Sequence, residues 1–136
     1  MSFKVLVVDD DDIIVLLHNI LIKENNLSSA PLGFENGKDA LDYLDVQDHT
    51  EDDYLLLLDI NMPVMNGWQL LDTIKASKFA DRVSAVIATS SVDYEDHEKA
   101  KEYPQIVAYF EKPLDERSFN KIKKLPQVAA HLPEID

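Results

Sequence analysis

Four short apolar segments and a weaker fifth, each followed closely by polar residues, constrain the fold of this chain more than any other feature. Nearly continuous apolar runs of this length are typical of strands that are buried on both faces of a parallel sheet. The weaker segment covers residues 28–33, where Pro31 favours an edge position over a central one. The four stronger runs lie at 3–8, 54–58, 83–88 and 106–110.

Stretches with apolar residues at helical spacing separate the predicted strands. The first follows Asp9–Asp12, so aspartates lie in its first turn, where the helix dipole favours them. Asp93 is predicted to cap a helix over about 94–103, and Asp115 to cap the last helix, which Pro126 is expected to stop or bend. The spacing is carried by Ile13, Leu17, Ile20 and Leu21, by Ala40, Leu41 and Leu44, by Trp68, Leu71 and Ile74, and by Phe119, Ile122 and Leu125. Strand and helix therefore alternate five times, which predicts an α/β fold with a parallel sheet, helices on both faces and right-handed crossovers.

Polar side chains that could bind a ligand or take part in a reaction lie at or just past the ends of four predicted strands. In open α/β sheets, sites lie beyond the C-terminal ends of the strands, where the strand order reverses. We therefore expect these side chains to gather at one edge of the sheet. They are Asp9, Asp10, Asp59, Thr89 and Lys112.

Three carboxylates at one edge would repel each other. At ~4 Å and an effective dielectric near 20, each pair costs about 4 kcal/mol before relaxation. Lys112 supplies one positive charge, and a hard divalent cation such as Mg²⁺, which prefers oxygen ligands, would supply two more. An aspartate can also be a nucleophile that forms an aspartyl-phosphate, a reaction that needs positioning and charge neutralisation. A metal, a lysine and the hydroxyl of Thr89 around one aspartate are the minimum parts for it.

Four motifs resemble those of the response-regulator receiver family. They are Val7-Val8-Asp9-Asp10, then Leu57-Leu58-Asp59-Ile60-Asn61-Met62-Pro63 with Met65-Asn66-Gly67, then Ala88-Thr89-Ser90, and then Phe110-Glu111-Lys112-Pro113. They follow family order and spacing over about residues 3–125. The resemblance implies a flavodoxin-like (βα)5 fold, a doubly wound parallel five-stranded sheet of order 2-1-3-4-5, which puts the Pro31 strand at an edge. It implies one receiver domain over 1–136, with a short tail at 126–136.

The resemblance also implies a metal site. Asp59 resembles the phosphoacceptor. Asp9 and Asp10 resemble the acidic pair that holds Mg²⁺ together with Asp59, with Asp10 as the more direct ligand. Asn61 resembles the position whose backbone carbonyl completes the metal shell.

The remaining motif residues resemble the parts that respond to the phosphoryl group. Thr89 resembles the switch hydroxyl that bonds this group, and Lys112 the lysine that pairs with it. Tyr109 resembles the switch aromatic that turns inward on activation, and Pro113 is expected to follow a cis peptide bond. Ser90 departs mildly from the small residue, usually Ala, that follows the switch threonine, which bears on rates only.

The implied function is that of a single-domain response regulator in a two-component or phosphorelay system. A histidine kinase or a histidine phosphotransfer protein would phosphorylate Asp59 with Mg²⁺. Signalling would pass through a downstream protein target, or the phosphoryl group would be passed on. We expect a phosphoacceptor domain with its own phosphotransfer and autodephosphorylation chemistry, and not an enzyme.

Two alternatives stay open. The first is a small metal-dependent phosphatase, because Asp9-x-Asp11 resembles the aspartate pair of haloacid-dehalogenase-type hydrolases. Ile13, where those proteins have Thr or Val, disfavours it. The second is an adaptor that binds partners without phosphorylation, which the complete set of motif residues disfavours.

Charge and composition exclude further classes. The chain has 13 Lys and Arg against 26 Asp and Glu, a net charge of −13, and no cysteine. The lack of a basic face disfavours binding to nucleic acid or to an anionic membrane, and thiolate metal sites are excluded. No apolar run reaches the ~18 residues of a membrane span and no signal peptide is apparent, so we expect a cytoplasmic location. The histidines are scattered and expected on the solvated surface: His18, His49, His97 and His131.

Overall fold

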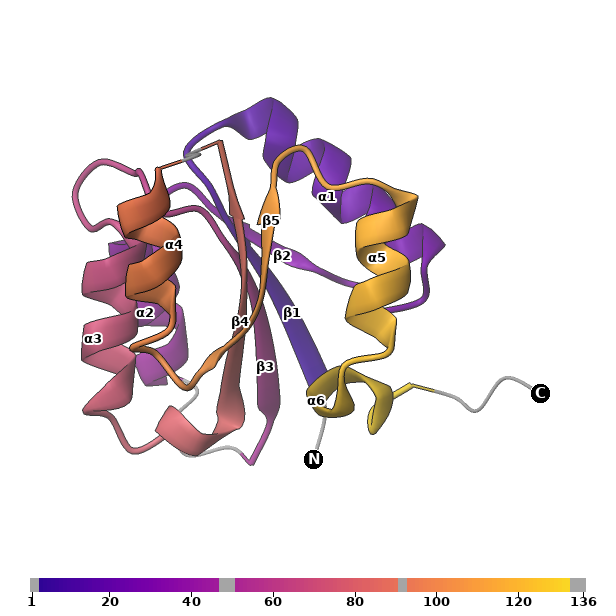
Figure 1. Ribbon diagram of the computed structural model, residues 1–136. Coiled ribbons are helices and arrows are strands. Elements are labelled where there is room, and N and C mark those ends of the chain that lie inside the picture. The colour runs from indigo at the N-terminus through magenta and orange to yellow at the C-terminus, as the bar shows by residue number, and fades with distance from the viewer. Residues whose placement is uncertain (1–2, 47–50, 91–92, 133–136) are drawn as a thin grey trace.

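A central parallel sheet carries helices on both faces (Figure 1) in the computed structural model, which describes residues 3–46, 51–90 and 93–132. His49 lies outside these ranges. The strands are β1 (Phe3–Val8), β2 (Leu32–Phe34), β3 (Asp53–Leu58), β4 (Val83–Thr89) and β5 (Ile106–Glu111). The helices are α1 (Asp12–Glu24), α2 (Gly37–Val46), α3 (Gly67–Lys75), α4 (Tyr94–Ala100), α5 (Glu116–Lys123) and α6 (Pro126–Ala129), and a 3-10 turn, η1, covers Ala80–Arg82.

The strand order is β2-β1-β3-β4-β5 and every neighbouring pair is parallel. The predicted fold class and strand order are therefore confirmed. The pairing also sets the site, because Val8 on β1 lies opposite Leu58 on β3. Asp9 and Asp59, the next residues along, consequently leave the sheet at the same level.

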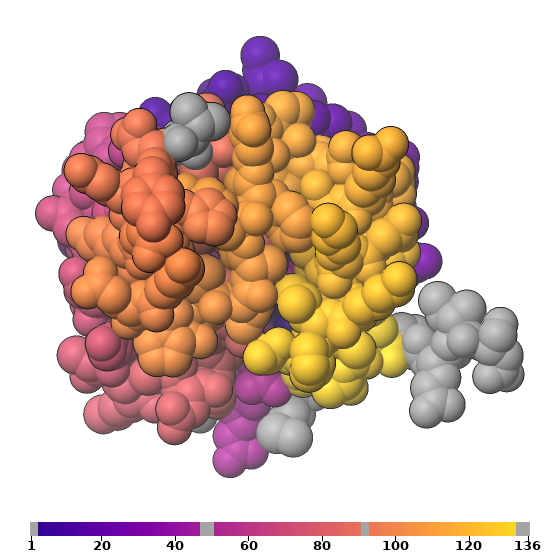
Figure 2. All heavy atoms as spheres, in the orientation of Figure 1, coloured from indigo at the N-terminus to yellow at the C-terminus, as the bar shows by residue number. Residues whose placement is uncertain are grey.

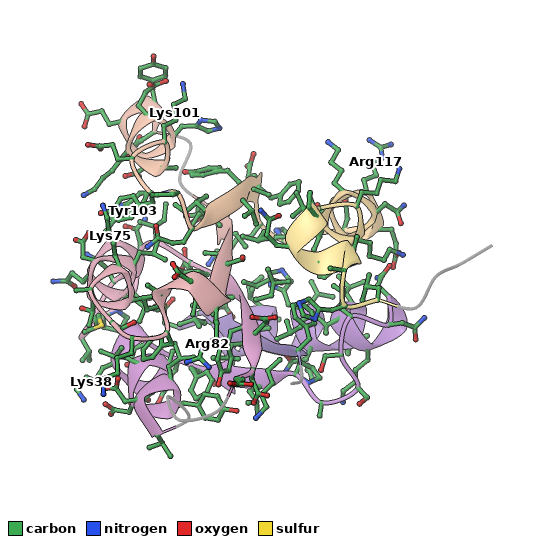
Figure 3. All side chains as sticks on the ribbon, turned by 90° about the horizontal axis from the view of Figure 1, so that it is seen from below. Lys38, Lys75, Arg82, Lys101, Tyr103 and Arg117 are labelled. Atoms are coloured by element: carbon green, nitrogen blue, oxygen red, sulfur yellow. The ribbon has the colours of Figure 1, made fainter. Side chains whose placement is uncertain are left out.

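The sheet separates two hydrophobic cores. On β3, Leu56 and Leu58 belong to one core, and Leu55 and Leu57 belong to the other. Successive side chains of a strand point to opposite faces, so a strand covered on both sides has no solvent-facing position. This explains the unbroken leucine run in the sequence. Helices α2, α3 and α4 contribute to the first core, and α1, α5 and α6 to the second (Figure 3).

Three elements differ from the sequence prediction. Strand β2 begins at Leu32, so Pro31, which has no N–H to donate, precedes it. Helix α4 ends at Ala100, three residues before the predicted end near Tyr103. Pro126, expected to stop or bend the last helix, begins the separate helix α6. Val128 of α6 is buried in the second core, so this part of the predicted tail packs on the domain.

The exposed face of α1 is more apolar than the helical spacing suggested. Ile13, Leu16 and Ile20 are exposed, whereas His18 and Ile22 are the buried residues of this helix. The expectation that His18 lies on the solvated surface is therefore wrong.

In the described parts of the chain, no helix has both the length and the apolar character needed to cross a membrane.

Side-chain caps fix the loops that lead from the sheet edge into the helices. Asp11 caps α1 by accepting from the backbone N–H of Ile13 and Ile14. Asn66 and Gln69 form a reciprocal capping box at the start of α3. The predicted cap Asp115 is confirmed, and Ser118 completes its box. Asp93 occupies the N-cap position of α4 without a side-chain cap bond.

The loop after β3 holds a strained residue, Val64, whose φ of 68° lies in the left-handed region. Its side chain is 80% exposed and has little packing to lose. A β-branched residue in this conformation costs about 1–2 kcal/mol. Replacing it with glycine relieves that strain, but part of the benefit is lost because glycine loses more backbone entropy on folding. We expect Val64→Gly to raise the free energy of unfolding by about 0.5–1 kcal/mol in urea titrations. Val64→Ala keeps most of the strain and serves as the control; a Val64→Gly protein less stable than wild type would contradict this account.

Candidate functional site

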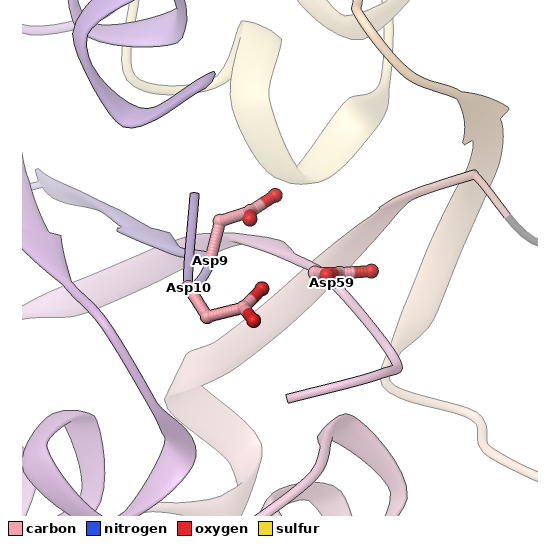
Figure 4. A group of neighbouring side chains, drawn as sticks. All are labelled: Asp9, Asp10 and Asp59. Carbon is pink, nitrogen blue, oxygen red and sulfur yellow. The ribbon is translucent and has the colours of Figure 1, made fainter. Parts of the chain in front are cut away.

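Three aspartates from two loops meet at the C-terminal edge of the sheet (Figure 4). One carboxylate oxygen from each of Asp9, Asp10 and Asp59 lies within 4.8 Å of the other two. Asp9 and Asp59 are 2% and 3% exposed, whereas Asp10 is exposed. The cluster therefore has two buried members and one that faces solvent.

Backbone hydrogen bonds hold these residues as continuations of the sheet. The N–H of Asp9 donates to the carbonyl of Phe34 on β2, and the N–H of Asp59 donates to that of Val8 on β1, both at 2.9 Å. The N–H of Lys112 likewise donates to the carbonyl of Thr89 at 2.9 Å. The hydrogen bonds of the parallel sheet thus fix the main-chain positions of the site residues independently of their side-chain contacts.

Lys112, which follows the edge strand β5, reaches the acidic cluster with its side chain. Its Nζ donates to Asp9 Oδ2 at 3.0 Å and to Asp59 Oδ2 at 3.1 Å. The peptide bond between Lys112 and Pro113 is cis, the geometry that the resemblance implied. The structure therefore brings together four of the predicted residues: Asp9, Asp10, Asp59 and Lys112.

Burial and pairing shift the pKa values of this group in a consistent way. Burial raises the pKa of Asp9, although the bonds from the Asp11 backbone and from Lys112 act against it, and the charge of Asp59 adds to the rise. Burial alone would lower the pKa of Lys112, but its bonds to two carboxylates outweigh burial and raise it. One ammonium, that of Lys112, is paired with the two carboxylates of Asp9 and Asp59, so the site keeps an excess of negative charge.

The donor set fits a hard divalent cation. Asp59 Oδ2 is engaged by Lys112, whereas Asp59 Oδ1 is buried without a hydrogen-bond partner. An unpartnered buried carboxylate oxygen is costly, and it lies beside two further carboxylates. Oxygen-only ligands with one solvent-facing member suit an ion such as Mg²⁺, which keeps several waters. Asn61 is exposed two residues beyond Asp59, and its role as a carbonyl ligand stays a prediction.

Thr89 and Tyr109 lie on the neighbouring strands. Thr89 ends β4 and is fully buried. Tyr109 on β5 pairs in register with Ile87, two residues before Thr89. The Tyr109 hydroxyl is buried without a hydrogen-bond partner, and its ring lies 4.5 Å from the ring of His97 on α4. Tyr109 thus links the strand beside the site to helix α4.

Two further residues, Gly67 and His18, shape the site in ways that their sequence positions alone do not reveal. A Cβ on Gly67 would lie 2.6 Å from the Asp59 carbonyl oxygen, so glycine is required where α3 starts against the acceptor loop. The sequence placed Gly67 in the motif that follows Asp59 but gave it no role of its own. His18 is buried and accepts a hydrogen bond at Nε2 from the backbone N–H of Leu114 at 3.2 Å. Its four-residue spacing from Ile22, on the buried face of α1, was the signal available.

Magnesium is expected to stabilise the fold, because a cation that binds only the folded state adds free energy by mass action, about 2.7 kcal/mol at ~100 times its Kd. Differential scanning fluorimetry with MgCl₂, against NaCl of equal ionic strength, should show a higher Tm. Asp10→Asn should reduce this rise and leave the metal-free protein as stable or more so, since it removes repulsion. Asp81→Asn at the opposite end of β4 should respond like wild type. Equal rises in wild type and Asp10→Asn would argue against a shared metal site.

Comparisons with known proteins agree with this geometry. Residues 5–123 match the response regulator receiver domain family. Chemotaxis protein CheV2 of Helicobacter pylori is 31% identical over 84 residues, which cover 52% of this chain and 27% of that protein. A two-component response regulator from Cytophaga hutchinsonii shares the fold with a TM-score of 0.80 and 28% identity, covering 88% of this chain and 92% of that one.

A response regulator receiver protein from Dyadobacter fermentans has a TM-score of 0.77 and 25% identity, covering 90% of this chain and 95% of that one. The family match spans all the strands except the first residues of β1, and all four motifs that surround the acidic cluster. This chain therefore belongs to the response regulator receiver domain family of two-component signalling.

Proposed function

We propose that this receiver domain accepts a phosphoryl group on the carboxylate of Asp59, with Mg²⁺ bound by Asp9, Asp10 and Asp59. One observation carries the proposal. Asp59 is 3% exposed, has one oxygen held by Lys112 and the other without a hydrogen-bond partner, and lies beside two more carboxylates. A carboxylate held in this way is a positioned nucleophile in a site that needs more positive charge.

The donor we propose is the phosphohistidine of a histidine kinase or of a histidine phosphotransfer protein. A bond forms between an Asp59 oxygen and phosphorus as the phosphorus–nitrogen bond of the donor breaks. Mg²⁺ supplies charge neutralisation for the phosphoryl oxygens, and Lys112 can offer its ammonium to the same group. The excess of acidic charge at this edge explains why a metal would be needed for a dianionic phosphoryl group to enter.

Transfer from a small phosphodonor tests this proposal directly. The full chain incubated with Mg²⁺ and acetyl phosphate should gain the mass of one phosphoryl group, and EDTA should prevent the gain. Steady turnover of an unrelated phosphate ester without an adduct would instead support the phosphatase alternative. No adduct and no turnover would leave the adaptor as the better description.

The phosphoryl group is proposed to act by shifting an equilibrium at the surface built from α4, β5 and α5, which lie side by side on one face in Figure 2. It adds charge and acceptor oxygens near the buried Thr89 hydroxyl. A ligand shifts such an equilibrium only by its different affinity for the two states. Tyr109, which contacts His97 of α4, is the link to this surface. A downstream protein would read the change, or the phosphoryl group would be relayed.

Thr89→Ala is expected to accept the phosphoryl group on Asp59 but to couple it poorly to Tyr109. The reason is that the variant lacks the hydroxyl that would move toward the phosphoryl oxygens. NMR spectra with and without beryllofluoride, a phosphoryl mimic, should show large shifts at Tyr109 and along α4 in wild type and small ones in Thr89→Ala. Thr73→Ala, which alters an exposed threonine of α3, is the control. An unreduced Tyr109 response in Thr89→Ala would contradict this coupling.

Nucleic acid is not part of the proposal. The basic residues labelled in Figure 3 come from α2, α3, η1, α5 and the end of α4, and they point in different directions. We propose a signalling domain and not an enzyme that turns over an external substrate. The cytoplasmic location expected from the sequence stays a prediction.

A further inference from the structure

His18 is a buried polar residue that the phosphorylation chemistry does not use. It lies on α1 and is 1% exposed. Its Nε2 accepts a hydrogen bond of 3.2 Å from the backbone N–H of Leu114, and this bond is itself buried. Because Nε2 is the acceptor, the proton of the neutral ring is on Nδ1.

The bond joins α1 to the turn that carries Lys112. Leu114 follows Lys112 by two residues and is itself buried. The Lys112 backbone is held on the other side by its bond to the Thr89 carbonyl. The turn is therefore fixed at both ends, by strand β4 before it and by the His18 imidazole after it. Lys112 Nζ spans from this turn to Asp9 and Asp59 at 3.0 and 3.1 Å.

The environment of His18 keeps its imidazole neutral, the form in which Nε2 can accept a hydrogen bond. Burial, with the positive charge of Lys112 adding to it, lowers the pKa of His18 to about 4. The imidazole is therefore neutral near pH 7. An apolar side chain at this position would leave the Leu114 N–H buried without a partner, which destabilises the local backbone by the full cost of its desolvation.

We propose that His18 is a positioning residue for the phosphoryl site: through its bond to the Leu114 N–H it holds the turn that places the Lys112 ammonium between Asp9 and Asp59. Its hydrogen bond is with Leu114, and not with Asp59 or the other two aspartates of the cluster. The inference rests on the proposed function, because it concerns the position of the Lys112 ammonium relative to an incoming phosphoryl group. It predicts that His18 acts on phosphoryl binding and not on metal binding.

The test compares replacements of His18 that lack a hydrogen-bond acceptor with one that carries such an acceptor, all in the full chain. His18→Leu removes the acceptor, and His18→Gln offers an amide oxygen at a similar reach. His18→Phe is a second acceptor-free variant that keeps a ring, for use if the leucine variant does not fold. Mg²⁺ affinity, and then beryllofluoride affinity in saturating Mg²⁺, are titrated well below each variant's Tm, with Lys112→Ala measured alongside.

We expect His18→Leu to weaken beryllofluoride binding by about ten-fold, as a small misplacement of a positioned group does. Mg²⁺ affinity should be unchanged, and His18→Gln should restore beryllofluoride binding. In the Lys112→Ala background, adding His18→Leu should cause no further loss, because the two residues act as one unit.

Three results would overturn the proposal. They are wild-type beryllofluoride affinity in His18→Leu, an equal loss of Mg²⁺ and beryllofluoride affinity, and a loss from His18→Leu that is as large without Lys112 as with it. Failure of the proposed function looks different. In that case the wild-type protein itself binds no beryllofluoride and gains no phosphoryl mass, whatever residue stands at position 18.

Discussion

Replacing Lys112 with methionine is expected to lower the free energy of unfolding by about 3 kcal/mol at pH 7 in the absence of metal, as is usual when one partner of a buried ion pair is removed. The side chains of Asp9 and Asp59 are 3% and 4% exposed, and that of Lys112 is 13% exposed. Methionine keeps much of the apolar stem and removes the charge. Two buried carboxylates then face each other without their cation.

Urea unfolding with Lys101→Met as the matched control measures this effect. Lys101 pairs with Glu98 at 2.9 Å on the exposed surface of α4, and such pairs are typically worth about 0–1 kcal/mol. A Lys112→Met protein that is no less stable than Lys101→Met would contradict the buried pairing. Asp59→Asn combined with Lys112→Met should recover part of the loss, because one uncompensated charge is removed.

The loss should also depend on pH in a defined direction. Burial already raises the pKa of Asp9 with Lys112 present, and removing Lys112 raises it further. A carboxyl group whose folded-state pKa is raised lowers stability as pH rises from its unfolded pKa, 3.8, through the folded value. The deficit of Lys112→Met against wild type should therefore be largest near pH 7 and shrink as pH falls toward 4. A deficit that grows on acidification would contradict this assignment.

Much of the fold could be predicted because the two-sided burial of a parallel sheet leaves a direct mark on the sequence. Leu55 to Leu58 alternate between two cores, so no polar residue interrupts them. Each such run ends where the strand leaves the sheet. That is why the positions of Asp9 and Asp59 at one edge followed from local patterns alone.

Features that depend on contacts between distant segments could not be predicted in this way. The strand ends place Lys112 at this edge, but its bonds to Asp9 and Asp59, 103 and 53 positions away, follow only from the packed structure. His18 looks like any isolated histidine until α1 is packed against the turn at Leu114, 96 positions later. Gly67 resembles an ordinary loop glycine until the close approach of the Asp59 carbonyl shows what a side chain would strike.

Apolar residues on a helix also misled the assignment of faces. Ile13 and Ile20 fit a helical stripe, yet both are exposed together with Leu16. The spacing identifies the helix, but it cannot say which of two apolar stripes meets the sheet when the helix carries both. The same helix buries a histidine on its inner face.

Replacing Asp59 with asparagine is expected to abolish phosphorylation completely. The amide keeps the volume and one oxygen but is not a carboxylate nucleophile. Among the clustered acids, Asp59 is the one that combines burial and a bond to Lys112 with a second oxygen that has no hydrogen-bond partner. Asp9 shares the lysine but also accepts from the Asp11 backbone at 2.9 Å, and Asp10 is exposed. We therefore expect one site of modification in the whole chain.

Asp12→Asn is the matched control, because Asp12 is an exposed aspartate in the first turn of α1 and lies outside the cluster. Its variant should be phosphorylated like wild type. Thermal unfolding of all three proteins should show that Asp59→Asn is folded, and its metal-free form should be as stable as wild type or more so, because a repelling charge is removed.

The most direct test that Asp59 is the phosphoacceptor is the intact mass of wild type, Asp12→Asn and Asp59→Asn after incubation with Mg²⁺ and acetyl phosphate. We expect one added phosphoryl group in the first two proteins and none in Asp59→Asn. An equal mass gain in all three would contradict it.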